Sequence, residues 1–241
     1  MSLSSTLDTL HGQAKRNQWL RYFTIFNRVV LAMGFLPSGY VKIIGERFTN
    51  LVVSHPMGHY LEAFHRTGFY YPFVGVMQMT AAVLLLIPRT ATLGAVLYFP
   101  IILNIFVLTI SVRFVGSLLT SPLMVLANLY LLCWDYDKLK YIFPFQQPTA
   151  TDLEARKNID TTFPTYFFAG VFAAVLAVGF TVTNMYSIQP YNNSKDCKRR
   201  CEGSNKSAAC YTFCDCIHQG GQPINKCLDE YNNAPADAVR K

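Results

Sequence analysis

Long stretches without charged residues constrain the fold of this chain more than any other feature. An α-helix rises 1.5 Å per residue, so about 20 apolar residues are needed to cross ~30 Å of hydrocarbon. Five stretches are long enough: residues 23–44, 69–87, 91–112, 114–134 and 163–186. Only the first contains charged residues, Arg28 and Lys42. Because lipid cannot hydrogen-bond the backbone, we predict five membrane-spanning α-helices.

The connections between these stretches predict how the helices are grouped. Residues 88–90 and Arg113 are very short links, which force neighbouring helices to run antiparallel. The expected order is an N-terminal segment (1–22), four spans (23–134), a polar linker (135–162), a fifth span (163–186) and a cysteine-rich tail (187–241). The predicted fold class is all-α: an integral membrane helical bundle of four antiparallel spans plus a fifth, with a small disulfide-stapled tail. Pro37, Pro100 and Pro122 lie inside expected spans and should kink or loosen them.

The charge distribution bears on partners and orientation. The net charge is +7, but no basic stripe alternates with stacking aromatic residues, so nucleic acid is not an expected partner. Basic residues instead flank the spans, where they meet lipid phosphates. An N-terminus on the cytosolic or matrix side gives the expected excess of basic residues in the inner segments, against Arg47, Arg66 and Arg113 outside. The basic residues after the fifth span oppose this orientation.

Cysteine placement supports the same orientation. Six of the seven cysteines lie in the tail: Cys197, Cys201, Cys210, Cys214, Cys216 and Cys227. A segment too short to build a large core, with this many cysteines, predicts three disulfides in an oxidising compartment. That compartment is periplasmic, extracellular or the mitochondrial intermembrane space. Cys197 and Cys201, and likewise Cys210 and Cys214, are spaced Cys-x-x-x-Cys, which suggests two helices cross-linked into a hairpin. The sequence leaves all fifteen disulfide connectivities of the six cysteines open. A zinc site in a cytosolic tail is the alternative.

Ionisable and amide side chains inside spans are candidates for ligand contact. Arg28 and Lys42 are costly in hydrocarbon, so they either reach the interface or face the bundle interior. In the second case they would contact an anion, a quinone carbonyl or a lipid, and the candidate cofactors are a quinone and a bound phospholipid. Polar residues that would line such a site are Ser38, Gln78, Asn104 and Asn128. These residues could equally join helices to one another.

A cluster of histidines lies in the first expected outer loop. Pro56 suits the first turn of a short helix, on which His55, His59 and Glu62 would share a face. These residue types bind metals, but a second set of ligands is missing. A surface helix that caps the bundle is therefore the favoured interpretation.

The region from Asn27 to Trp134 resembles the DoxX-like family of four-helix membrane proteins. The resemblance rests on Asn27-Arg28-Val29-Val30, Gly34-Phe35-Leu36, Ser38-Gly39, Lys42, Thr67-Gly68-Phe69 and Leu84-Leu85-Leu86-Ile87-Pro88-Arg89. It implies a four-helix fold, and relatives that include small subunits of thiosulfate:quinone oxidoreductase, cargo receptors and receptor-assembly chaperones. This chain has Gln78 where the family often has glutamate, and its fifth span and tail lie outside the family core.

No catalytic constellation is recognisable in the sequence, so a non-enzymatic role is favoured while an enzymatic one stays open. We expect an accessory or structural subunit of a larger respiratory or redox-linked membrane complex, with the tail as its docking surface. The expected partners are membrane lipids and other subunits of that complex. The alternatives are a quinone-interacting redox subunit of DoxX type and a membrane chaperone or cargo receptor.

Overall fold

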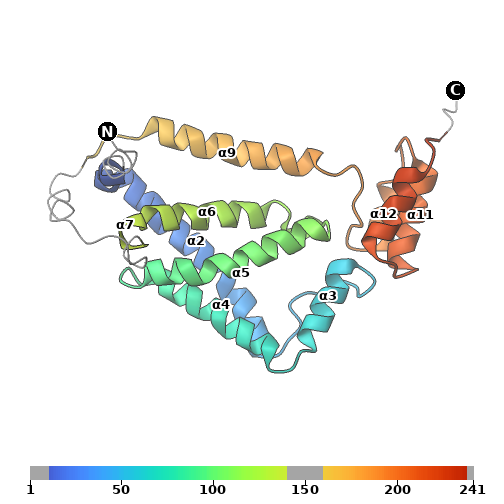
Figure 1. Ribbon diagram of the computed structural model, residues 1–241, viewed down its shortest axis with the longest axis horizontal. Helices are drawn as coiled ribbons and strands as arrows, with labels where there is room; N and C mark the ends of the chain where they lie inside the picture. Colours follow the sequence, from blue (N-terminus) through green and yellow to red (C-terminus); the bar gives the residue numbers. More distant parts are fainter. Residues whose placement is uncertain (1–10, 140–159, 238–241) are drawn as a thin grey trace. The chain divides into compact units, whose positions relative to one another are not determined.

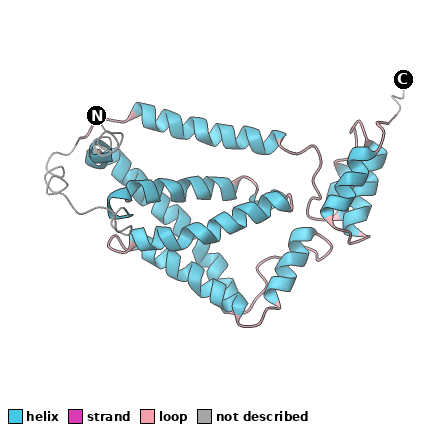
Figure 2. Cartoon of the chain, in the orientation of Figure 1, coloured by secondary structure: helices cyan, strands magenta, loops and turns pink. Residues whose placement is uncertain are grey.

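The computed structural model describes residues 11–139 and 160–237, and their regular structure is helical apart from one isolated bridge between Asn17 and Asp160 (Figure 2). Parts of the expected N-terminal segment (1–10), linker (140–159) and tail (238–241) lie outside the described residues.

The apolar stretches form helices close to the expected ranges. These are α2 (Gln18–Ile43), α4 (Tyr70–Leu86), α5 (Ala91–Ser111), α6 (Thr120–Trp134) and α9 (Thr165–Asn184), coloured from blue to orange in Figure 1. Short elements lie between them: α3 (Pro56–His65), η1 (Val115–Ser117) and α7 (Tyr136–Leu139). The all-helical prediction is therefore confirmed.

Fewer helices than five meet a strict length and hydropathy test for crossing a membrane. Three do so among the described residues: Ala91–Ser111, Val115–Trp134 and Thr165–Asn184. A fourth is added if α3 and α4, which are bent by 98°, count as one broken span. These apolar helices are compatible with an integral membrane protein.

Local signals explain where the helices begin and end. Helix α2 starts earlier than expected because Asn17 caps it: its Oδ1 accepts hydrogen bonds from the N–H groups of Trp19 (3.0 Å) and Leu20 (3.2 Å). Gly45, with a φ of 75°, follows its last turn. The expectation that Pro122 distorts a span was wrong. Helix α6 begins at Thr120, so Pro122 lies in the first turn, where its missing N–H costs little.

The chain forms two compact units. The first comprises Met1–Pro37, Met77–Ile102 and Leu123–Val178, and the second comprises Ser38–Val76, Leu103–Pro122 and Gly179–Lys241. In the first unit, Phe35 stacks on Tyr98 at a centroid distance of 3.6 Å, and the Tyr98 hydroxyl donates to the Leu31 carbonyl. Gly94 allows α5 to approach α4, since a Cβ there would lie 2.6 Å from the Leu85 nitrogen.

Helix α9 is the most exposed of the apolar helices. None of its residues is buried. Its start belongs to the first unit and contacts α2 and α6 through aromatic rings: Phe167 lies 5.6 Å from Phe23 and 5.7 Å from Tyr130, centroid to centroid. The rest of its apolar surface is exposed.

The tail forms a three-helix module in the second unit. We call residues 187–237 the cysteine module; it contains α10 (Ser194–Arg199), α11 (Ser207–His218) and α12 (Ile224–Asn233). Its core is built from Ile188, Phe213, Ile217 and the cysteines, with α11 packed on both α10 and α12. A segment of this size needs covalent cross-links because it can bury little apolar surface.

Candidate functional site

Lys42 is the predicted site residue with the least ordinary surroundings. It lies at the end of α2 in the second unit and is only 5% exposed. Its Nζ donates to the Ser38 carbonyl (3.0 Å) and to the Ser38 hydroxyl (2.7 Å), and it lies 4.3 Å from the centre of the Phe48 ring. No carboxylate among the described residues pairs with it, so these contacts solvate the ammonium without neutralising it. Two of the predicted residues, Ser38 and Lys42, are thus brought together.

Arg28 has a different environment in the first unit. Its Nη2 lies 3.5 Å from Oδ2 of Asp135, which is 4% exposed. Asp135 also accepts hydrogen bonds from the Thr92 hydroxyl (2.8 Å) and from Lys138 Nζ (3.0 Å). This carboxylate therefore joins α2, α5 and the end of α6, and it supplies Arg28 with a counter-ion.

Sequence reasoning missed Asp135, which it assigned to the polar linker. The signal was its position directly after Trp134, where a single carboxylate ends a long uncharged run. Its pairing with Arg28 joins residues 107 positions apart, which spacing alone does not reveal.

For Asn104 and Asn128, no described contact links the side chain to either cation. Gln78 is buried at 1% exposure and has interaction partners of its own. Asn128 is fully buried, and its Nδ2 donates to the Ala95 carbonyl at 3.2 Å, as a residue that joins helices does. Asn104 is exposed.

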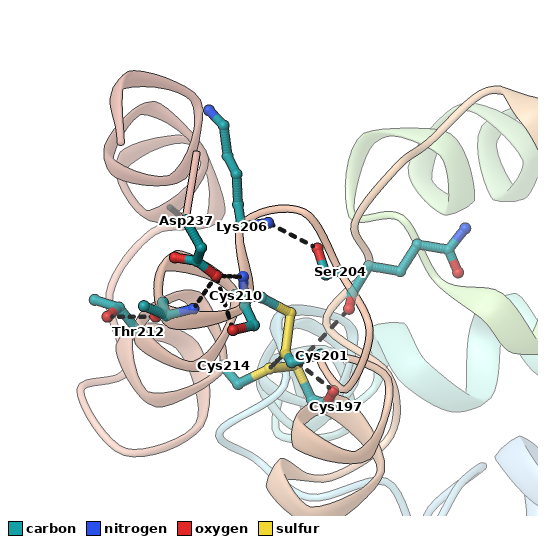
Figure 3. Close-up of a disulfide and its surroundings, with 11 residues drawn as sticks. Cys197, Cys201, Ser204, Lys206, Cys210, Thr212, Cys214 and Asp237 are labelled. Atoms are coloured by element: carbon teal, nitrogen blue, oxygen red, sulfur yellow. Dashed lines mark hydrogen bonds between the residues drawn. A yellow bond between two sulfur atoms is a disulfide. The ribbon is translucent and has the colours of Figure 1, made fainter. Parts of the chain in front are cut away.

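The six tail cysteines form three disulfides, as predicted. Cys197 pairs with Cys214 and Cys201 with Cys210, which staples α10 and the turn after it to α11; Figure 3 shows both bonds. Cys216 pairs with Cys227 and joins α11 to α12. The Sγ atoms of Cys201, Cys210 and Cys214 lie within 4.8 Å of one another, but sulfurs in disulfides have no thiolate to offer zinc.

Asp237 completes the cysteine module by capping α11 from outside that helix. Its Oδ2 accepts hydrogen bonds from the Ser207 hydroxyl (2.8 Å) and from the N–H groups of Ser207 and Ala208 (Figure 3). The Ser207 hydrogen bond is the main cause that lowers the pKa of Asp237. The residue before α11, Lys206, provides no side-chain cap, so the carboxylate from the end of the module satisfies these donors.

The cysteine module also contacts the connection between α5 and η1. Arg113 donates from Nη1 to the Ile188 carbonyl at 2.8 Å, and its guanidinium lies 4.3 Å from the centre of the Tyr186 ring. The Tyr186 hydroxyl donates to the Ile110 carbonyl. A cavity of 360 Å³ opens on the module between Tyr191, Arg200 and Tyr231.

The structure gives the three residues of the histidine cluster different surroundings. A short helix follows Pro56 as expected, but His59 is exposed. Glu62 pairs with Arg47 at 3.1 Å and with Arg66 at 2.8 Å, and the Arg66 hydrogen bond lowers the pKa of Glu62. His55 is 1% exposed and caps α3: its Nδ1 accepts a hydrogen bond from the Met57 N–H at 3.0 Å.

Sequence reasoning did not consider one of the ring neighbours of His55. The ring of His218, at the end of α11, lies 6.2 Å from that of His55, centroid to centroid. Phe114 approaches His55 at 6.0 Å. Because the two histidines are far apart in the sequence, no spacing pattern could have paired them.

Apolar helices together with a disulfide-bonded helical module define an all-helical protein of the kind compatible with membrane insertion. The chain is 34% identical over 143 residues to the uncharacterized protein YwoB of Bacillus subtilis (strain 168); the alignment covers 54% of this chain and 87% of YwoB. The chain belongs to the same family as YwoB. No family model and no solved structure matches it.

Proposed function

We propose that this chain is an accessory subunit of a larger, redox-linked membrane assembly and that the cysteine module is its docking surface. The observation that carries the proposal is the cysteine module itself: three disulfides and a small core, placed directly after a helix with no buried residue. Cross-links of this density preserve a surface outside the cytosol. The open apolar surface of α9 and the cavity beside Arg200 offer a partner both membrane and aqueous contacts.

Five crossings fit this role if α3 and α4 together form one broken span and α2 also spans the bilayer. Two charged residues lie within the apolar stretch of α2, Arg28 and Lys42, and the structure accommodates both. Arg28 has Asp135 as a counter-ion, and Lys42 donates to a carbonyl and a hydroxyl one turn away. Intramembrane charges are tolerated when they are paired or bonded to backbone carbonyls in this way.

The proposed sidedness places the N-terminus in the cytosol or matrix and the cysteine module in the periplasm, outside the cell or in the intermembrane space. An odd number of crossings separates the two termini. Disulfides require the oxidising side for the module. The resemblance to DoxX-like proteins supports a redox-linked partner for the four-span part, although fold alone does not determine chemistry.

Copurification from native membranes tests the accessory role. We expect the wild-type protein to migrate with partner subunits at fixed stoichiometry in mild detergent. A Cys216→Ser/Cys227→Ser double variant should lose the partners because α12 is no longer tied to α11. Cys133→Ser, which changes a free cysteine, should keep them. A wild-type protein that is always alone contradicts the proposal, and a transient client would favour the chaperone alternative.

A second candidate function, binding of a quinone or an anionic lipid, is favoured by Lys42. A buried ammonium that is paired with no carboxylate of the described residues provides a donor for a quinone carbonyl or a lipid phosphate, and Ser38 orients it.

Analysis of lipids and quinones retained by the purified protein tests this candidate. We expect a retained quinone to fall at least tenfold in Lys42→Met and to persist in Arg89→Gln, which changes an exposed cation. Retention of an anionic phospholipid with the same dependence would assign the site to lipid. Equal retention in both variants would exclude Lys42 as the contact.

A further inference from the structure

His55 and His218 have complementary hydrogen-bonding states. The Met57 N–H can only donate, so Nδ1 of His55 must be unprotonated and, in the neutral ring, Nε2 carries the proton. The Pro190 carbonyl can only accept, so Nε2 of His218, at 2.6 Å, carries the proton and Nδ1 has the free lone pair. One ring thus offers a donor and the other an acceptor.

The same two atoms are buried without a partner. Nε2 of His55 and Nδ1 of His218 have no hydrogen-bond partner among the described residues. The rings are neighbours, with centroids 6.2 Å apart and planes tilted by 46°. A hydrogen-bonded bridge between the rings, direct or through one water, would satisfy both atoms.

We propose that His55 and His218 form a proton-sensitive latch: the neutral pair holds the cysteine module against the start of α3, and protonation of His55 releases it. The latch regulates the docking surface and therefore rests on the proposed function for its biological meaning. Its chemistry depends only on the two rings.

Protonation removes the attraction at each ring. A proton on His55 must go to Nδ1, where it faces the Met57 N–H and destroys the cap of α3. A proton on His218 must also go to Nδ1. This atom can then no longer accept a hydrogen bond from Nε2 of His55, because both nitrogens are donors. Two imidazolium rings at this separation also repel each other.

The surrounding charges do not compensate for this change. His59 is exposed on α3, and Glu62 is engaged by two arginines. On the other elements, Arg113 lies beside Phe114 and adds positive charge, while Asp215 on α11 pairs with Lys198 of α10. Burial, with a smaller effect of His218, lowers the pKa of His55 to about 4.

The sign of the pH dependence follows from that shift. A histidine whose folded pKa lies below its unfolded value of about 6.5 binds more protons when released. The latch is therefore complete above about pH 6.5 and weakens toward pH 4. In that window the released population should rise by up to tenfold for each pH unit, the limit for one proton.

Hydrogen exchange in the full-length protein, in detergent and corrected for the intrinsic rate at each pH, tests the latch. We expect amides at Met57–His59 and Ile188–Tyr191 to lose protection from pH 7 to 5 in the wild type and in His59→Asn. In His55→Asn, which keeps a good N-cap, and in His218→Gln, which keeps a donor for Pro190, that pH dependence should be lost. An unchanged pH dependence in both variants, or none in the wild type, overturns the latch. Copurification with partners is a separate measurement, so the latch and the docking role can fail independently.

Discussion

At the scale of single residues, two cations on α2 are accommodated in two different ways. Arg28 has a buried counter-ion, Asp135, that also accepts hydrogen bonds from Thr92 and Lys138. Lys42 has polar neighbours and an aromatic ring but no carboxylate among the described residues. The first arrangement is what a structural tie between helices requires. The second is the arrangement on which the proposed quinone or lipid contact rests.

Replacing Asp135 tests whether its cluster is structural. Asp135→Asn keeps the shape of the side chain but leaves Arg28 without a counter-ion in a site where the carboxylate is 6% exposed. Loss of one partner of a buried pair costs about 3 kcal/mol. We expect a lower thermal midpoint in detergent. Asp137→Asn, which breaks a more exposed pair with Lys15, should cost at most about 1 kcal/mol. Equal effects of the two changes would show that the cluster has no special role.

The sequence pointed to individual candidate residues more readily than to the side chains that contact them. Arg28 and Lys42 were recognisable because charges in apolar runs are rare. Asp135 and His218 were not, because their importance depends on contacts with distant parts of the chain. Glu62 matched a metal-ligand spacing, but Arg47 and Arg66 engage it, and a helical spacing does not report such competition.

At the scale of secondary-structure elements, hydrophobicity predicted the long helices to within a few residues. The start of α2 differed because Asn17 caps it with its side chain. The break before α6 differed because η1 interrupts the apolar run. Helix caps and short breaks depend on individual hydrogen bonds, which the length and hydropathy of a stretch do not predict.

Two glycines in helices allow a matched test of close packing. A Cβ at Gly94 would lie 2.6 Å from the Leu85 nitrogen, whereas nothing lies within 4 Å of one at Gly170. Gly170→Ala should therefore stabilise the protein by up to about 1 kcal/mol through helix propensity. Gly94→Ala should destabilise it by roughly 1–3 kcal/mol because α4 and α5 must separate. Thermal unfolding of both variants in one detergent decides the signs, and stabilisation by Gly94→Ala would contradict the close approach.

Asp237 makes the start of α11 sensitive to acid. Hydrogen bonding from Ser207 lowers the pKa of Asp237, so its contribution is complete above the unfolded pKa of about 3.9 and is lost as pH falls through the lower, folded value. Hydrogen exchange at Ser207 and Ala208, corrected for the intrinsic rate at each pH, should therefore lose protection in that range. Asp237→Asn should raise exchange already at pH 7 and remove the acid dependence. Asp229→Asn, an exposed change on α12, should behave like the wild type.

At the scale of the whole molecule, the all-helical architecture of the described residues was predictable, because uncharged runs of about 20 residues are typical of long apolar helices. The number of disulfides was predictable from cysteine count, but their pairing required the helices to be placed. The similarity to YwoB places the chain in a family, and the alignment covers about half of the chain. The function of the cysteine module therefore has to be derived from its own residues.

Sidedness is the property of the whole molecule on which the proposed function depends most. Three disulfides and one free cysteine, Cys133, allow it to be measured directly. In a Cys133→Ser background every thiol belongs to the cysteine module, so a membrane-impermeant maleimide reports on the module alone. We expect no labelling of intact membranes from either side before reduction, because disulfides do not react with maleimide. After reduction, labelling should occur only from the non-cytosolic side. Labelling from the cytosolic side without reductant would mean free thiols in a reducing compartment, which would exclude the proposed topology and return zinc to consideration as the ligand of these cysteines.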